Sequence, residues 1–228
     1  MKQLPETTKT QKVLGFAAWG IQMLILPTVL SILLPTIAPA MGEAQTNFIY
    51  HGLSFLLLTA ALLPFLWHSF KTIFERPFYT LRMAFYGYVL YWVSFLAITW
   101  VIKRFVTGFQ NTNDDAISQL LKENYTLTAI VVLFFAPIAE ELVYRGLIFG
   151  TLHSRSPLAA YILSAAAFAS IHVLGYLETH SPAQLALCFL QYIPAGLTLA
   201  WVYGRTGTIW APIVMHIAIN QTSLLSLR

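Results

Sequence analysis

Charged residues are scarce in this sequence: Asp, Glu, Lys and Arg together make up 10% of its 228 residues. Soluble domains usually carry about a quarter. Hydrophobic residues make up 57%, and the mean hydropathy is +0.68. This composition excludes an ordinary soluble domain and is typical of membrane proteins. Because no polar stretch is long enough to form a core of its own, we expect residues 1–228 to form a single integral membrane domain in the lipid bilayer.

Cysteine is nearly absent as well. Cys188 is the single cysteine, so no disulfide can form within the chain, and its apolar surroundings indicate a small buried residue. The net charge of +4 is modest, and the basic residues lie at the ends of apolar segments instead of in one patch. Binding to nucleic acid therefore has no support.

The most prominent feature of the sequence is its long apolar runs. A bilayer core about 30 Å thick requires about 20 residues of helix. By that rule we predict an all-α, polytopic transmembrane helix bundle of about seven spans, with six to eight as the range: Val13–Leu34, Phe48–Trp67, Met83–Ile102, Thr126–Gly150, Pro157–Tyr176, Ala183–Tyr203 and Thr208–Leu225.

Three shorter features complete the prediction of spans. The apolar run from Val13 to Ile37 is far longer than the roughly 7–15 residues of a signal-peptide core, so we expect a retained anchor. The segment Asp114–Leu121 has apolar residues at helical spacing and predicts a short amphipathic helix. An eighth short element is also compatible with Phe70–Phe78.

Basic residues also predict an orientation. If the N-terminus is cytoplasmic, eight of them lie on the cytoplasmic side: Lys2, Lys9, Lys12, Lys71, Arg76, Arg82, Arg155 and Arg205. The opposite side carries four, Lys103, Arg104, Lys122 and Arg228, and Arg145 lies within a span. Because cytoplasmic loops are enriched in Lys and Arg, we expect a cytoplasmic N-terminus and an external C-terminus. The short loops and small size favour a bacterial cell membrane.

The charged residues inside the predicted spans are Glu140, Glu141 and Arg145. A charge at the bilayer centre costs at least about 2.5–3.5 kcal/mol, so these groups must face the interior of the bundle or a wet cavity. Glu141 and Arg145 are four residues apart and can pair on one helix face. Glu140 is rotated by about 100° and shares a face with Tyr144 instead. The unpaired Glu140 is the candidate general base; a purely structural alternative is that the pair only joins helices.

Two histidines on other predicted spans supply further polar groups. His172 follows Phe168 by one helical turn, and His216 precedes Asn220 by one turn. At about 1.5 Å per residue, Glu140 and both histidines lie at compatible depths along their helices. We therefore expect these residues to meet in one intramembrane polar site.

The residue types leave two chemistries open. In the first, Glu140 activates a water molecule while His172 or His216, with the carboxamide of Asn220, polarises a carbonyl. In the second, Glu140, His172 and His216 bind zinc, which itself acidifies the water. The zinc signature HExxH on one helix is absent, so no motif requires a metal.

The three segments resemble the three motifs of the CPBP family of intramembrane proteases, which includes the type II CAAX prenyl endopeptidases and the bacterial Abi proteins. EExxxR corresponds to Glu140–Arg145, FxxxH to Phe168–His172 and HxxxN to His216–Asn220. The resemblance covers residues 126–220, which form the motif-bearing core. It implies an intramembrane endopeptidase in which Glu140 activates water and His172, His216 and Asn220 complete the site. In it, Glu141 and Arg145 hold the geometry, with zinc or the glutamate alone as the alternatives.

The resemblance also implies a class of substrate: a peptide or a membrane protein, which is lipidated in the eukaryotic members that cleave prenylated CAAX tails. Bacterial members are associated with bacteriocin immunity and the handling of surface proteins. Two other function classes stand beside hydrolysis. A proton- or ion-coupled transporter is disfavoured because the sequence has no inverted repeat. A non-catalytic membrane immunity or binding protein is the remaining alternative.

Overall fold

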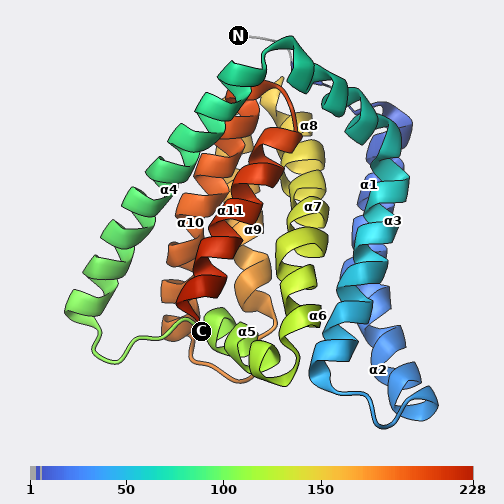
Figure 1. Ribbon diagram of the computed structural model, residues 1–228, viewed down its shortest axis with the longest axis vertical. Coiled ribbons are helices and arrows are strands. Elements are labelled where there is room, and N and C mark those ends of the chain that lie inside the picture. The colour runs from blue at the N-terminus through green and yellow to red at the C-terminus, as the bar shows by residue number, and fades with distance from the viewer. Residues whose placement is uncertain (1–3, 6, 228) are drawn as a thin grey trace.

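The computed structural model describes residues 4, 5 and 7–227. Its helices pack into one bundle, in which the first helix begins at one end and the last helix ends at the other (Figure 1). An odd number of crossings gives this arrangement. The described residues contain helices and no strand.

Seven helical paths run along the bundle within the described residues, and a short helix crosses one of its ends. The paths are α1 (Lys9–Gly20) with η1 (Ile21–Ile25) and α2 (Leu26–Ile37); α3 (Glu43–Lys71) with η2 (Thr72–Glu75); α4 (Pro77–Phe105); α6 (Tyr125–Ile130) with η3 (Val131–Phe135), α7 (Ala136–Glu141), η4 (Leu142–Phe149) and α8 (Gly150–His153); α9 (Pro157–Leu174); α10 (Pro182–Thr206); and α11 (Trp210–Ser226). The crossing helix is α5 (Thr112–Glu123).

Six of these paths are long and apolar enough to cross a membrane, and α11, with 17 residues, runs beside them. The prediction of an all-α polytopic bundle is confirmed, and the protein is an integral membrane protein. Two predictions of detail change. The fifth span ends at Leu174 instead of Tyr176, because a turn follows. The segment Phe70–Phe78 holds the short turn η2 and no eighth span.

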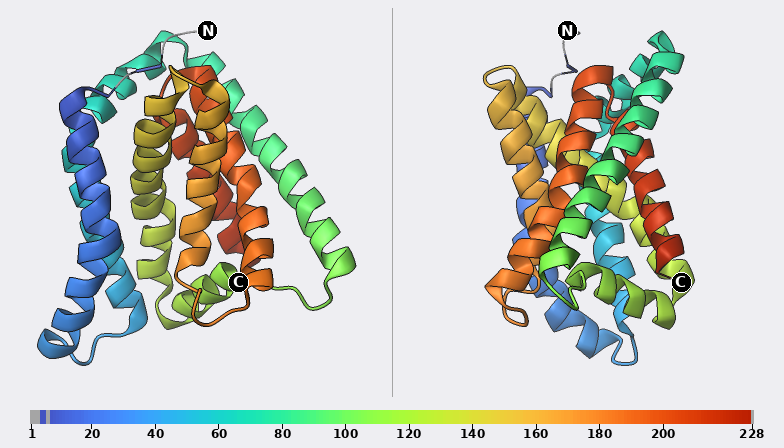
Figure 2. Two further views of the ribbon diagram at one scale, coloured as in Figure 1. Left: turned by 180° about the vertical axis from the view of Figure 1, so that it is seen from behind. Right: turned by 90° about the vertical axis from the view of Figure 1, so that its left-hand side faces the viewer.

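The predicted amphipathic helix is present as α5. It lies across the end of the bundle at which α11 finishes (Figure 2). Asn111 caps its start, accepting hydrogen bonds from the backbone N–H groups of Asn113 and Asp114. The end of α5 is tied to α3, because the Glu123 carboxylate accepts a hydrogen bond from the N–H of Ala44 at 3.1 Å. These contacts make α5 a wall of the bundle.

Two paths widen into a π-type turn just before a proline. The turn η1 precedes Pro27, and the turn η3 precedes Pro137. Proline has no N–H and its ring clashes with the carbonyl one turn back, so an inserted residue relieves the clash. At η3 the N–H of Ala136 bonds to the carbonyl of Val131, five residues back. The next carbonyl, that of Val132, would need the N–H that Pro137 lacks.

The helices α9 and α10 approach each other closely at Gly196. A Cβ atom there would lie 2.7 Å from the Ala165 Cα, a separation that real Cβ atoms do not show. We expect Gly196→Ala to lower the free energy of unfolding by about 1–3 kcal/mol, because overpacking forces the two backbones apart. Thermal unfolding in detergent measures this effect.

Gly20→Ala is the matched control for that substitution. Gly20 is helical, and a Cβ atom there would meet nothing within 4 Å. Alanine favours a helix more than glycine does. We therefore expect Gly20→Ala to unfold at or above the wild-type temperature, and an equally unperturbed Gly196→Ala would contradict the packing argument.

Candidate active site

Glu141 and Arg145 form the ion pair that their spacing predicts. Arg145 Nη1 lies 3.1 Å from Glu141 Oε1, and both side chains have no solvent exposure. Arg145 also donates from Nη2 to the Gly196 carbonyl of α10 at 3.1 Å, and its guanidinium lies 4.6 Å from the Phe168 ring centroid. The arginine thus joins three helical paths, and the glycine lets α10 approach closely enough for its carbonyl to be reached.

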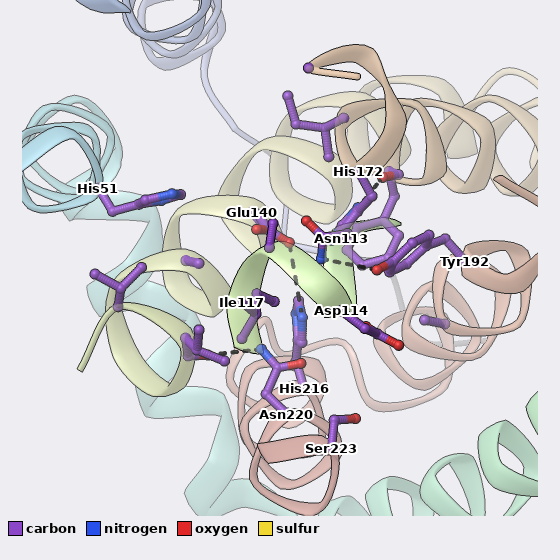
Figure 3. A pocket seen from close by; sticks show the side chains of 18 of the residues that line it. His51, Asn113, Asp114, Ile117, Glu140, His172, Tyr192, His216, Asn220 and Ser223 are labelled. Carbon is purple, nitrogen blue, oxygen red and sulfur yellow. Dashed lines mark hydrogen bonds and ion pairs between the residues drawn. The ribbon is translucent and has the colours of Figure 1, made fainter. Parts of the chain in front are cut away.

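His216 lies between the two glutamates. Its Nδ1 is 2.9 Å from Glu141 Oε1, and its Nε2 is 3.9 Å from Glu140 Oε2 (Figure 3). A carboxylate only accepts hydrogen bonds, so the Nδ1 atom must carry a hydrogen and the Nε2 atom faces Glu140. At 3.9 Å the Nε2–Oε2 contact is too long for a hydrogen bond. The sequence analysis paired Glu141 with Arg145 alone and missed this second partner.

The two glutamates differ in accessibility. The Glu140 side chain retains 19% of its exposure, whereas the Glu141 side chain has none. Glu140 lines the cavity described below, while Glu141 is held by Arg145 and His216. Water can therefore reach the first carboxylate and not the second.

Two aromatic rings and one hydrogen bond hold the His172 ring. Its Nδ1 is 2.8 Å from the Phe168 carbonyl, so Nδ1 donates and Nε2 is left with a lone pair. Its ring stacks on Tyr192 with centroids 4.0 Å apart and tilts against Phe168 at 4.7 Å. Tyr192 carries no sequence motif, and the sequence analysis did not identify it.

Phe168 is the common neighbour of the site. Its ring contacts His172, His216, Tyr144 and the Arg145 guanidinium. The Tyr144 ring meets it edge-on at 5.6 Å and lines the same cavity as Glu140. The two supporting aromatic residues predicted from the sequence thus lie beside the polar groups.

Asn220 bonds to the carbonyl that Pro137 leaves without a donor. Its Nδ2 donates to the Val132 carbonyl at 2.8 Å. One hydrogen of the amide is used in this way and the second is not. The π-type turn η3 therefore positions the third motif against the helix that carries Glu140.

One cavity of about 580 Å³ connects these groups, a size that suits a ligand site. Glu140, His172, His216 and Asn220 all line it, so the structure brings the four candidate residues to one cavity (Figure 3). The cavity continues to α5 at one end of the bundle and to the His51 ring on α3. His51 was also missed, because a lone histidine in an apolar span has no local signal.

The candidate metal ligands do not form a ligand set. Within the described residues, no three His, Cys, Asp or Glu side chains are placed to hold one metal ion. His172 and His216 each use Nδ1 for a contact within the protein, which leaves both Nε2 atoms free, and the His216 Nε2 lies 3.9 Å from Glu140. The zinc alternative therefore stays a prediction, and no step below passes through a metal.

The three motifs lie inside a segment that matches a known protein family model. Residues 122–222 match the family model of the type II CAAX prenyl endopeptidase Rce1-like proteins, and the match contains all three motifs. This segment is therefore similar to the Rce1-like family. The helices α1 to α4 and most of α5 precede the segment that matches the Rce1-like model.

Two bacterial proteins are similar to this chain. YdiL of Bacillus subtilis (strain 168), a candidate membrane peptidase, is 31% identical over 118 residues, which cover 51% of this chain and 43% of YdiL. The UPF0177 protein YxdF of Lactococcus lactis subsp. lactis (strain IL1403) is 25% identical over 147 residues, covering 64% of this chain and 74% of YxdF. The chain therefore spans less than half the length of YdiL. No solved structure matches it.

Proposed function

We propose that this protein is an intramembrane endopeptidase that hydrolyses a peptide bond with water activated by Glu140. The observation that carries the proposal is that the two adjacent carboxylates differ in their partners and in their access to the cavity. Glu141 is sealed between Arg145 and His216, whereas Glu140 opens on the cavity. The match of residues 122–222 to the Rce1-like family model and the similarity to a candidate membrane peptidase support the same activity.

Water activation uses two acceptors. Glu140 accepts one hydrogen of the water, and the free Nε2 of His172 accepts the other. Glu140 takes the proton as the water oxygen bonds to the carbonyl carbon of the substrate. The C–N bond then breaks, and Glu140 returns that proton to the leaving nitrogen.

Oxyanion stabilisation uses two donors. A protonated His216 presents its Nε2–H to the cavity, and the Glu141 carboxylate balances the charge through Nδ1. Asn220 has a second amide hydrogen beyond the one bonded to Val132. Fixed donors of this kind stabilise the negative charge that develops on the carbonyl oxygen.

Cleavage of a panel of quenched membrane peptides by the purified protein in detergent tests the proposal. The panel includes prenylated and unlipidated peptides, because the substrate is proposed only as a peptide or membrane protein. We expect cleavage by wild type, loss of cleavage in His172→Ala, and no loss after chelation. Chelator-sensitive cleavage would favour the zinc alternative, and absence of cleavage by wild type would favour a non-catalytic immunity or binding role.

The predicted orientation is a further part of the proposal. Lys71, Arg155 and Arg205 lie at the end of the bundle where α1 begins, and α5 covers the other end. With the basic end in the cytoplasm, the cavity approaches the external face of a bacterial cell membrane. Substrate would then reach Glu140 from outside.

Cysteine labelling checks this orientation. Ser154 and Glu178 are exposed at opposite ends of the bundle, and the native Cys188 is buried. In intact cells, a membrane-impermeant maleimide is expected to label Glu178→Cys and to leave Ser154→Cys unlabelled until the cells are opened. The reverse pattern would place the cavity mouth in the cytoplasm.

A further inference from the structure

One wall of the cavity is built by α5. Asn111, Asn113 and Asp114 line it together with two apolar residues of the helix, Ile117 and Leu120 (Figure 3). The Rce1-like match begins at residue 122, so the family motifs assign no role to this wall.

Polar contacts fix the start of α5 against the bundle. Asn111 Nδ2 donates to Gln191 Oε1 at 2.8 Å, and Asn113 Nδ2 donates to the Tyr192 hydroxyl at 3.0 Å. The Tyr176 hydroxyl donates to Asn113 Oδ1 at 3.4 Å. Both asparagines therefore have protein partners on α10 or just after α9.

Asp114 differs from these neighbours. Its carboxylate makes no hydrogen bond or ion pair with any residue that the structure describes, although its backbone N–H bonds to Asn111. An acidic residue in the first turn stabilises a helix through the dipole, which is a sufficient structural reason for Asp115. Asp115, however, is exposed, whereas Asp114 lines the cavity. Stabilisation of the helix dipole therefore does not explain why the Asp114 side chain faces the cavity.

Three tyrosines from other elements line the same cavity as Asp114. They are Tyr91 of α4, Tyr176 after α9 and Tyr192 of α10, and the last two hydrogen-bond to Asn113, the residue before Asp114. Aromatic faces and a carboxylate are the groups with which proteins bind an ammonium or guanidinium cation.

The described lining of the cavity contains two carboxylates, Asp114 and Glu140, and no lysine or arginine. Arg145, which is close to the site in sequence, is committed to Glu141 and the carbonyls of α10. A ligand is therefore the available source of a lysine or arginine charge beside Asp114.

We propose that Asp114, with Tyr91 and Tyr176, forms a subsite that binds the cationic side chain of a lysine or arginine in the peptide substrate. This inference rests on the proposed function, and it specifies the substrate class as peptides with a basic residue near the scissile bond. Substrate selection then comes from the α5 wall, whereas bond cleavage comes from the three motifs.

A binding measurement on the full-length Glu140→Gln protein in detergent tests the subsite without turnover. Fluorescent membrane peptides carrying one lysine at successive positions are compared with matched glutamine peptides by anisotropy. At one position we expect the lysine peptide to bind about tenfold more tightly, because hydrogen bonds to charged groups are stronger than neutral ones. Asp114→Asn in the same background is expected to remove the difference, and Asp115→Asn, the matched control, to retain it.

The pH dependence gives a second measurement that needs no change at Asp114. Burial raises the pKa of Asp114 to about 6, and the charge of Asp115 adds to the shift. The lysine preference should therefore be present above pH 6 and be lost as the pH falls through that value and the carboxylate is protonated. Asp114→Asn should abolish this dependence. That result separates the effect of Asp114 from titration of the other groups that line the cavity, which are His51, His172, His216, Glu140, Tyr50, Tyr91, Tyr144, Tyr176 and Tyr192.

The outcomes distinguish this inference from the proposed function. Equal binding of lysine and glutamine peptides, no binding of either, or a lysine preference that survives Asp114→Asn overturns the subsite. Cleavage of both peptide types by the protein with Glu140 intact would leave the endopeptidase proposal standing in those cases. Conversely, an Asp114-dependent preference without any cleavage supports the subsite and overturns the peptidase.

Discussion

Glu140→Gln is expected to reduce peptide cleavage by about 10²- to 10⁴-fold, the usual contribution of a general base, while the protein stays folded. Glutamine keeps the shape of the side chain but cannot take the proton from water. The substitution should not destabilise the bundle, because Glu140 Oε2 is buried and has no hydrogen-bond partner among the described residues. Turnover on the best peptide of the panel and the melting temperature in detergent together measure the result.

Glu178→Gln is the matched control. Glu178 is an exposed carboxylate in the connection between α9 and α10 and is outside the cavity lining. Its removal is expected to leave turnover unchanged. Wild-type turnover by Glu140→Gln would remove Glu140 from the mechanism, and an unfolded Glu140→Gln protein would show that the carboxylate supports the fold.

Arg145→Ala is expected to have the largest effect on stability, a loss of about 3–5 kcal/mol, with poor expression as its consequence. The substitution leaves the Glu141 carboxylate unexposed and without its cation. It also removes the hydrogen bond to the Gly196 carbonyl and the contact with the Phe168 ring. Yield of monodisperse protein and thermal unfolding measure the loss.

Two further variants test that explanation. Arg205→Ala removes an exposed arginine from the last turn of α10 and is expected to change stability little. Adding Glu141→Gln to Arg145→Ala removes the stranded charge, so the double variant should be more stable than Arg145→Ala alone. If the double variant is no better, lost packing against Phe168 and α10, instead of an unpaired charge, explains the defect.

Contacts within one helix could be predicted from the sequence. The pairing of Glu141 with Arg145 follows from a spacing of four residues, because helical geometry places such residues on one face. The helix α5 follows in the same way from the spacing of Ile117, Leu120 and Leu121. The spans follow from the length of apolar runs.

For contacts between helices, the sequence predicted which residues lie near one another but not which atoms bond. Depth along the spans predicts that Glu140, His172 and His216 converge, and all three line one cavity. The partner of each nitrogen could not be predicted. The His216 Nδ1 bonds to Glu141, and the Asn220 amide bonds to Val132, because the rotation and register of α11 against α7 and η3 place them there.

The sequence by itself determined the class of protein, the seven helical paths and the three motifs, because apolar length and helical period are local properties of a chain. The tertiary structure alone decided that Glu141 is buried between Arg145 and His216 while Glu140 lines the cavity, and that Asp114 faces the same cavity. These outcomes depend on how helices distant in the sequence rotate and tilt against one another. No local pattern encodes that, because burial and pairing in a bundle are set by neighbours on other helices.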